Sequence, residues 1–473
     1  MAFLKSCQHA ILTKCPLLLL NFLTYSLIVA SLYLACLATT HSLSLPRGPI
    51  FSIFLLVLLG LLAGEGVRLL RIPPMLGMLI VGIALRNVPK VSDLTVLDSQ
   101  ISSALKNVAL MIILMKGGLS LDIMDIKRVG FAVIRLAFLP CFIEATIFAI
   151  LSVFLLHLPW IWGFLLGFVI AAVTPAIIVP CLMELKRRKF NVESNNISTM
   201  LISASSFDDV LSISAFMVCL SSAFSSDKPL YRQIIQGPLE IILGIIIGVV
   251  FGLLLWILPP IRDNKVESKA RLVLLILLGL SAVFGMNYVE FSGSGPLSVI
   301  VMSLTAIKGW KEDILVSKGV DFLWFAGEPL LFGLVGMDIQ LLLITPDLLW
   351  KSLIIIFVSL FFRLATAFTA VSRTGLSFRE KIFVSFSWIP KATVQAAIGS
   401  YALGVATEQG ADDTVVNYSK VIVTVAVLVI LVSAPLGAIL MYVTAPFLLQ
   451  RVEYDMELEQ SDTENQEIRS VAN

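Results

Sequence analysis

Two adjacent aspartates, Asp208 and Asp209, lie within the stretch SSFDDVL, inside a run that is otherwise apolar enough to cross a lipid bilayer. STMLISA precedes the pair and VLSISAFMVCL follows it, which disfavours the alternative that the pair marks a helix end in water. A charge at the centre of a bilayer costs at least about 2.5 kcal/mol on insertion scales, so two in succession indicate a functional site. Because neighbours on a helix point about 100° apart, the two carboxylates must face different partners.

The chemistry that such a pair can perform is the exchange of one charged occupant for another. A buried carboxylate can be neutralised by a proton or by a metal cation. If it accepts either occupant but not both, competition couples proton movement in one direction to cation movement in the other, which is the minimal chemistry of an antiporter. The hydroxyls of Thr174, Ser205 and Ser206 could supply oxygen ligands to a small hard cation. Backbone carbonyls released where helices are interrupted could do the same.

Three further charged residues lie in apolar surroundings and need partners. Glu144 and Arg363 each lie well inside an apolar run, where an unpaired charge is costly. Arg363 could pair with Glu144 or with Asp208, and a purely structural salt bridge is the simpler interpretation. Lys391 directly follows Pro390, where it could offset the negative end of an interrupted helix. Alternatively, its long side chain could extend to the membrane surface.

The composition indicates that membrane helices must position these residues. Of 473 residues, 58% are hydrophobic and 14% are charged, and the mean hydropathy is +0.96, which excludes a soluble globular protein. Apolar runs of about 17 to 25 residues are continuous rather than alternating, so helices and not a β-barrel are expected. We therefore predict an all-α membrane protein with about fourteen transmembrane helices. Their centres fall near residues 26, 57, 80, 110, 144, 171, 209, 246, 277, 299, 329, 360, 391 and 430.

Composition also limits the expected partners and cofactors. The net charge of +2 is near balance, so no nucleic-acid partner is expected. The sequence contains no P-loop or nucleotide fingerprint, so we expect no nucleotide and no cofactor, and an existing ion gradient as the energy source. The six cysteines and three histidines are scattered without a CxxC pair, which predicts neither a disulfide framework nor a zinc site.

Basic residues are distributed unevenly between alternate loops. KRRK at 186–189 and RDNKVESKAR at 262–271 contrast with HLPW and GVATEQGADD, which carry no lysine or arginine. By the positive-inside rule the basic loops are cytoplasmic, which places both termini in the cytoplasm with an even number of spans. We divide the chain into an extra N-terminal transmembrane helix (1–48), a transport domain (49–447) and a short cytoplasmic tail (448–473). The first apolar run is longer than the core of a signal peptide.

A weak internal repeat indicates two related halves. LMKGGLSLDI, which contains Asp122, resembles LFGLVGMDI, which contains Asp338. Pro175 lies 53 residues after Asp122, and Pro390 lies 52 residues after Asp338, and both prolines interrupt apolar segments. The segment between the matching positions Asp122 and Asp338 contains an odd number of predicted helices. The two halves should therefore be inverted relative to each other in the membrane. Interrupted helices in matching positions of inverted repeats are typical of the binding site of a secondary transporter.

With SSFDDVL, TPAIIVP and WIPKATVQAAIG in this order, the chain resembles the sodium/proton antiporter superfamily, and most closely its animal NHA branch. The resemblance runs from about residue 50 to residue 447, and the extra first helix fits fourteen-span members of that branch. It implies the NhaA-like fold, in which two discontinuous helices cross within inverted repeats. It also implies a homodimer embedded in membrane lipids, with a dimerisation part and a core part that carries the ion by an elevator-like motion.

The resemblance also implies roles for individual residues. Asp209 would be the principal site for sodium or lithium and for the proton, with Asp208 as its neighbour. Thr174 and Pro175 would lie at the first helix crossing. Arg363 stands where bacterial relatives usually have a lysine. An arginine cannot release its proton as a buried lysine can, so the charge stoichiometry stays open.

Other classes of protein fit the sequence less well. A cation channel would need a continuous polar path, whereas the polar residues cluster around one site. A sodium-coupled solute symporter could share the architecture, but adjacent aspartates fit competition with protons better. An intramembrane aspartyl protease needs two carboxylates converging from separate helices, which neighbours on one helix do not readily provide. The plasma membrane, an endolysosomal membrane and the mitochondrion all remain open as locations.

Overall fold

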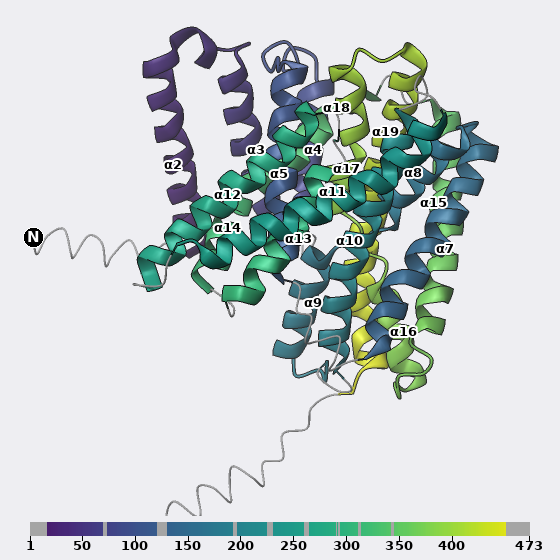
Figure 1. Cartoon of the computed structure of the whole chain (residues 1–473). Coiled ribbons are helices and arrows are strands. Elements are labelled where there is room, and N and C mark those ends of the chain that lie inside the picture. The colour runs from purple at the N-terminus through teal and green to yellow at the C-terminus, as the bar shows by residue number, and fades with distance from the viewer. Residues whose placement is uncertain are drawn as a thin grey trace, which may run out of the picture.

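A computed structural model (Figure 1) describes residues 17–69, 73–120, 130–192, 196–224, 230–259, 264–289, 291, 294–310, 314–341 and 345–450. Within these ranges the regular elements are all helices, without a β-strand. In chain order they are α2 (Leu17–Thr40), the 3-10 turn η1 (His41–Ser44), α3 (Pro49–Leu69), α4 (Pro74–Asn87), α5 (Ser99–Ser120), α7 (Phe131–Leu156), α8 (Trp160–Ala171), α9 (Pro175–Arg187), α10 (Ile197–Ala223), α11 (Leu230–Ile257), α12 (Asn264–Tyr288), α13 (Ser294–Trp310), α14 (Ile314–Met337), α15 (Pro346–Ala370), α16 (Phe378–Ser387), α17 (Thr393–Gly399), α18 (Tyr401–Glu408) and α19 (Asp413–Leu448).

Ten candidate spans in the described residues are long and apolar enough to cross a membrane. The predicted spans near residues 26, 80, 299 and 391 are not among the ten. The first falls in α2, the next two fall in helices of 14 and 17 residues, and the last falls in an interrupted helix. The all-helical membrane architecture is therefore confirmed, whereas the count of fourteen stays a prediction.

Local sequence explains where several helices begin. Proline stands at the start of α3, α4, α9 and α15, where its missing N–H would have no partner within the helix anyway. Ser377 and Glu380 form a reciprocal capping box at the start of α16. Each of these signals fixes a helix end and thereby the register of the side chains that follow it.

The helices pack into two bundles that meet along one interface. The first bundle contains α3, α4, α5, α11, α12, α13 and α14, with α2 against α3. The second bundle contains α7 to α10 and α15 to α19. Figure 1 shows α2 and α3 on the side of the molecule opposite α7 and α15. Across the interface, α5 contacts α10, α17 and α18, and α10 contacts α11 and α13, so α10 lies at the boundary.

Two helices of the second bundle are interrupted, and the interruptions touch each other. Residues 172–174 separate α8 from α9, and residues 388–392 separate α16 from α17. Thr174 N donates to Pro390 O over 3.0 Å. Proline lacks the N–H needed to continue a helix and restricts the residue before it to extended geometry. Thr174, directly before Pro175, is accordingly extended, with φ −98° and ψ 105°.

Candidate functional site

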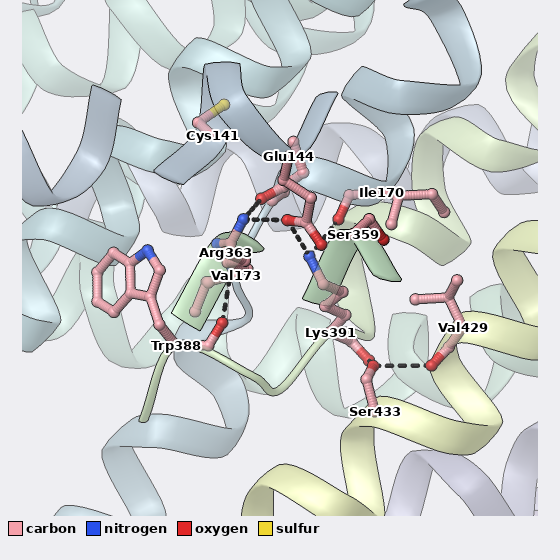
Figure 2. Close-up of polar contacts among 12 residues, drawn as sticks. Cys141, Glu144, Ile170, Val173, Ser359, Arg363, Trp388, Lys391, Val429 and Ser433 are labelled. Carbon is pink, nitrogen blue, oxygen red and sulfur yellow. Dashed lines mark hydrogen bonds and ion pairs between the residues drawn. The ribbon is translucent and has the colours of Figure 1, made fainter. Parts of the chain in front are cut away.

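Four charged side chains converge inside the second bundle. Glu144 comes from α7, Asp208 from α10, Arg363 from α15 and Lys391 from the connection between α16 and α17. Each is at most 2% exposed. Figure 2 shows Arg363 and Lys391 directed at Glu144 from two sides. Four separate chain segments, brought together by the two interruptions, therefore build one buried charge cluster.

Arg363 is the centre of this cluster. Its Nη1 donates to Glu144 Oε2 and, over 2.5 Å, to Ala171 O. Its Nη2 donates to Asp208 Oδ2 over 3.1 Å, and its Nε donates to Trp388 O over 2.8 Å. The sequence left open whether Arg363 pairs with Glu144 or with Asp208, and the planar fork of the guanidinium reaches both. It also ties the two interruptions together through their backbone carbonyls.

Lys391 is buried and paired. Its Nζ donates to Glu144 Oε2 over 2.7 Å and to Ile170 O over 2.6 Å. The alternative that Lys391 extends to the membrane surface is wrong. The physical reason is that the end of α8 and Glu144 together offer the ammonium group two negative acceptors inside the bundle.

Side chains satisfy all four carbonyls at the end of α8. A helix leaves its last four carbonyls without helical partners. Besides Arg363 and Lys391, Gln395 of α17 supplies the caps: its Nε2 lies 3.2, 3.3 and 2.7 Å from the carbonyl oxygens of residues 169, 170 and 172. These carbonyls are therefore engaged, as is that of Pro390. The carbonyls of residues 169–172 and of Pro390 are therefore not free to bind a cation, contrary to our expectation for carbonyls released at the interruptions.

The sequence alone gives only a weak indication that Gln395 belongs to the site. It is a single amide side chain in the mostly apolar stretch TVQAAIG. A single uncharged residue of this kind does not disclose its partners, which lie more than 220 residues earlier in the chain.

All three hydroxyl residues predicted as ligands, Thr174, Ser205 and Ser206, make hydrogen bonds within the protein. Thr174 Oγ1 accepts hydrogen bonds from Ala392 N over 2.6 Å and from Thr393 N over 3.2 Å. Thr174 therefore joins the two interruptions and caps the start of α17. Ser205 Oγ donates to Ile202 O one turn earlier in α10, over 2.9 Å. Neither Thr174 nor Ser205 lines the cavity at Asp209, whereas Ser206 does.

Asp209 faces away from the charge cluster and into the interface between the bundles. A cavity of about 20 Å³, called the small cavity here, lies beside it. It is lined by Leu110, Ile113, Leu114, Gly117 and Gly118 of α5, Ser206, Asp209, Val210 and Ile213 of α10, Ile300 of α13, and Val394 and Ala397 of α17. This volume holds about one water-sized occupant. Asp209 Oδ1 is buried without a hydrogen-bond partner among the described residues.

The five ionisable groups do not balance. Glu144, Asp208 and Asp209 carry three negative charges when ionised, against two positive charges on Arg363 and Lys391. Asp208 and Glu144 have cationic partners, so the uncompensated negative charge belongs to Asp209. One proton or one monovalent cation at Asp209 would neutralise the site.

A larger cavity of about 720 Å³, called the large cavity here, lies further along α5 at the same interface. It was not predicted. Ser103 Oγ of α5 donates to Glu408 Oε1 of α18 over 2.7 Å, which joins the two bundles. Lys106 of α5 pairs with Asp338 over 2.7 Å. Asp338 is one landmark of the sequence repeat, and its counterpart Asp122 lies outside the described residues. Because Lys106 and Leu110 are one helical turn apart, the two cavities follow one another along α5.

The chain shares its fold with a solved helical membrane protein. It superimposes on the sodium proton antiporter MjNhaP1 from Methanocaldococcus jannaschii with a TM-score of 0.66 at 22% identity, over 85% of this chain and 98% of that one. A likeness at this level of identity shows a common fold and no more.

Sequence comparison then identifies the family. A family model described as the transmembrane sodium/hydrogen exchanger matches residues 35–442. Sodium/hydrogen exchanger 9B2 from Homo sapiens is 37% identical over 444 residues, covering 92% of this chain and 82% of the relative. Sodium/hydrogen exchanger 9B1 from Homo sapiens is 36% identical over 454 residues, covering 93% and 86%. The chain belongs to the sodium/hydrogen exchanger family, which confirms the resemblance stated from the motifs. By name these relatives are ion exchangers rather than enzymes.

Proposed function

We propose that this integral membrane protein exchanges sodium or lithium ions for protons, and that the two compete for Asp209. The observation that carries the proposal is the contrast between neighbouring carboxylates. Asp208 Oδ2 accepts from Val173 N over 2.8 Å and from Arg363, so only its Oδ1 lacks a hydrogen-bond partner, and Asp208 does not line the small cavity. Asp209 lines that cavity, and its Oδ1 has no hydrogen-bond partner in the described residues. A carboxylate with an open oxygen and room for one occupant is suited to accept a proton or a dehydrated small cation in turn.

The charge balance supports exchange of one proton for one cation. Arg363 stays protonated throughout, and Lys391 is held by Glu144, so these groups keep the site's fixed charge constant. The remaining charge on Asp209 is neutralised equally by one proton or by one sodium or lithium ion. We therefore propose electroneutral exchange as the stoichiometry, which the sequence left open.

We further propose that the second bundle moves against the first in an elevator-like motion. The proposal is supported by the site's position, since every charged group of the cluster belongs to the second bundle, whereas both cavities lie between the bundles. The interrupted pairs α8/α9 and α16/α17 would be the two crossing helices of inverted repeats. Their mutual hydrogen bonds would keep the site rigid while the bundle moves.

The family resemblance supports a proposal for the assembly, and the charges of the loops support one for the orientation in the membrane. We propose a homodimer formed through the first bundle, in a bilayer with both termini cytoplasmic. The basic loops at 186–189 and 262–271 support this orientation. The plasma membrane and endolysosomal membranes are the proposed locations, with the mitochondrion as the alternative.

The test is proton movement in proteoliposomes. Internal pH is followed after sodium, lithium or potassium is added outside, for wild type, Asp209→Asn and Asp208→Asn. Asp347→Asn serves as the matched control, because Asp347 is an exposed residue of α15 whose pairing with Lys351 contributes little. We expect exchange by wild type and Asp347→Asn, and none above empty liposomes by Asp209→Asn.

The same experiment separates the rival functions. Cation entry without proton exit would identify a channel. Sodium entry that requires an organic solute would identify a symporter. Normal exchange by both aspartate variants would refute the proposed site and make the pair structural.

A further inference from the structure

Gln395 lies at the point where the end of α8 meets the aspartate pair. It is fully buried, and its amide nitrogen lies near two carbonyl oxygens of α8 and closest to that of Ala172, the residue directly after α8, at 2.7 Å. Its Oε1 has no hydrogen-bond partner among the described residues. The donor side of the amide, rather than its acceptor side, is therefore what the protein uses.

One peptide unit connects Gln395 to Asp208. The carbonyl of Ala172 accepts from Gln395, and the N–H of the same peptide, belonging to Val173, donates to Asp208 Oδ2 over 2.8 Å. A peptide unit is planar and rigid, so fixing its carbonyl also fixes the direction of its N–H. Residues 172–174 lie outside any helix, so this unit lacks the restraint that a continuous helix would provide.

A neutral donor is the suitable group for this task. Arg363 and Lys391 already contribute two positive charges to the end of α8. A third cation would compensate the remaining negative charge of the site and so remove the need for a bound proton or cation. A glutamine supplies the missing hydrogen bonds without altering that balance.

We propose that Gln395 is a positioning residue for ion exchange: by anchoring the Ala172–Val173 peptide it fixes Asp208, and through the shared helix α10 it sets where Asp209 presents its open oxygen. This inference rests on the proposed function. In this role Gln395 affects the affinity for the cation, whereas a purely structural residue would affect only the stability of the fold.

The experiment compares sodium dependence of exchange in proteoliposomes for wild type, Gln395→Met and Gln395→Glu. Methionine has a similar length but no donor, and glutamate has the same shape with an oxygen in place of the donating nitrogen. Gln409→Met is the matched control, because Gln409 is exposed. Gln395→Met removes the hydrogen bond from Gln395 to the carbonyl of Ala172. We therefore expect its KM for sodium to be about tenfold higher than that of wild type, with the maximal rate nearly unchanged.

Thermal unfolding of the purified variants in increasing sodium provides the second readout. We expect the sodium concentration that gives half of the maximal stabilisation to rise in parallel with the KM. An unchanged KM in either folded variant would overturn the proposal. Recovery of neither variant as folded protein would also contradict it, because Gln395 would then serve the fold. Absence of exchange in wild type would instead refute the proposed function.

Discussion

At the scale of single residues, the adjacent aspartates differ because a helix turns about 100° between them. Asp208 points into the second bundle and is held by Arg363 and by Val173 N. Asp209 lies at the boundary with the first bundle, where it lines the small cavity and its Oδ1 has no hydrogen-bond partner among the described residues. In the proposed mechanism Asp208 is therefore the fixed carboxylate and Asp209 the exchangeable one, and each assignment can be tested.

The first prediction concerns competition at Asp209. If a proton and a cation share one carboxylate, protons raise the apparent KM for sodium without changing the maximal rate. Lowering the pH on the sodium side should therefore raise that KM, by up to about tenfold per pH unit when the site is mostly protonated. Initial rates of exchange, measured at several pH values over sodium concentrations from well below the KM to saturation, check this. A maximal rate that falls while the KM stays constant would argue against competition.

The second prediction concerns Arg363, whose guanidinium contacts two carboxylates and two backbone carbonyls. Arg363→Met leaves buried acceptors unpaired and should destabilise the protein by roughly 3–5 kcal/mol. Arg373→Met is the control, since Arg373 is exposed just beyond α15. Thermal unfolding in detergent measures the difference. Equal stability of the two variants would mean that the cluster contributes nothing net to the fold.

At the scale of elements, the site depends on two interrupted helices that hold one another. Thr174 Oγ1 accepts the N–H groups of Ala392 and Thr393, and Thr174 N donates to Pro390 O. In this way the start of α17 is capped by a residue from the other interruption. The N–H groups of Thr174, Ala392 and Thr393 and the carbonyl of Pro390 thus find partners within the protein, as a membrane interior requires.

Replacing Thr174 with valine tests this arrangement. The substitution keeps the shape and removes the acceptor of two buried N–H groups, so a loss of about 1–3 kcal/mol in unfolding free energy is expected. Thr366→Val is the matched control, because the Thr366 hydroxyl donates to carbonyls of its own helix. Thermal unfolding of both purified variants provides the comparison. Wild-type stability of Thr174→Val would show that water or relaxation replaces the lost bonds.

Sequence patterns predicted some of these elements and not others. Long apolar runs predict membrane helices. The aspartate pair could be recognised as a candidate site because charged side chains are costly inside a bilayer. The partners of Arg363 could only be narrowed to two, because Glu144 lies 219 residues away along the chain. The role of Gln395 and the large cavity could not be predicted, since they arise from packing between helices distant in sequence. The inverted repeat stays a prediction, with Asp122 outside the described residues.

At the scale of the whole molecule, the two bundles meet along an interface that holds both cavities. At the large cavity, Glu408 of α18 accepts from Ser103 of α5 and from Asn287 of α12, which belong to the other bundle. Movement of one bundle against the other must break these contacts. They therefore mark positions at which motion between the bundles can be blocked.

A cross-link between the bundles tests the motion. Ser103→Cys with Glu408→Cys, joined by a short thiol-reactive cross-linker that is cleaved by reduction, should stop exchange until the link is cleaved. Lys116→Cys with Asp321→Cys is the control, because this exposed pair lies within the first bundle. Exchange is measured before cross-linking, after it and after reduction. Continued exchange by the linked Ser103–Glu408 pair would rule out the elevator-like motion.

The most direct measurement of the central claim is proton release on cation binding. Purified protein in weakly buffered detergent solution is mixed with sodium or lithium, and a pH indicator records the protons set free. Wild type and the exposed-site variant Asp347→Asn should release protons, and Asp209→Asn should release none. Undiminished release from folded Asp209→Asn would contradict the claim that proton and cation compete for this carboxylate.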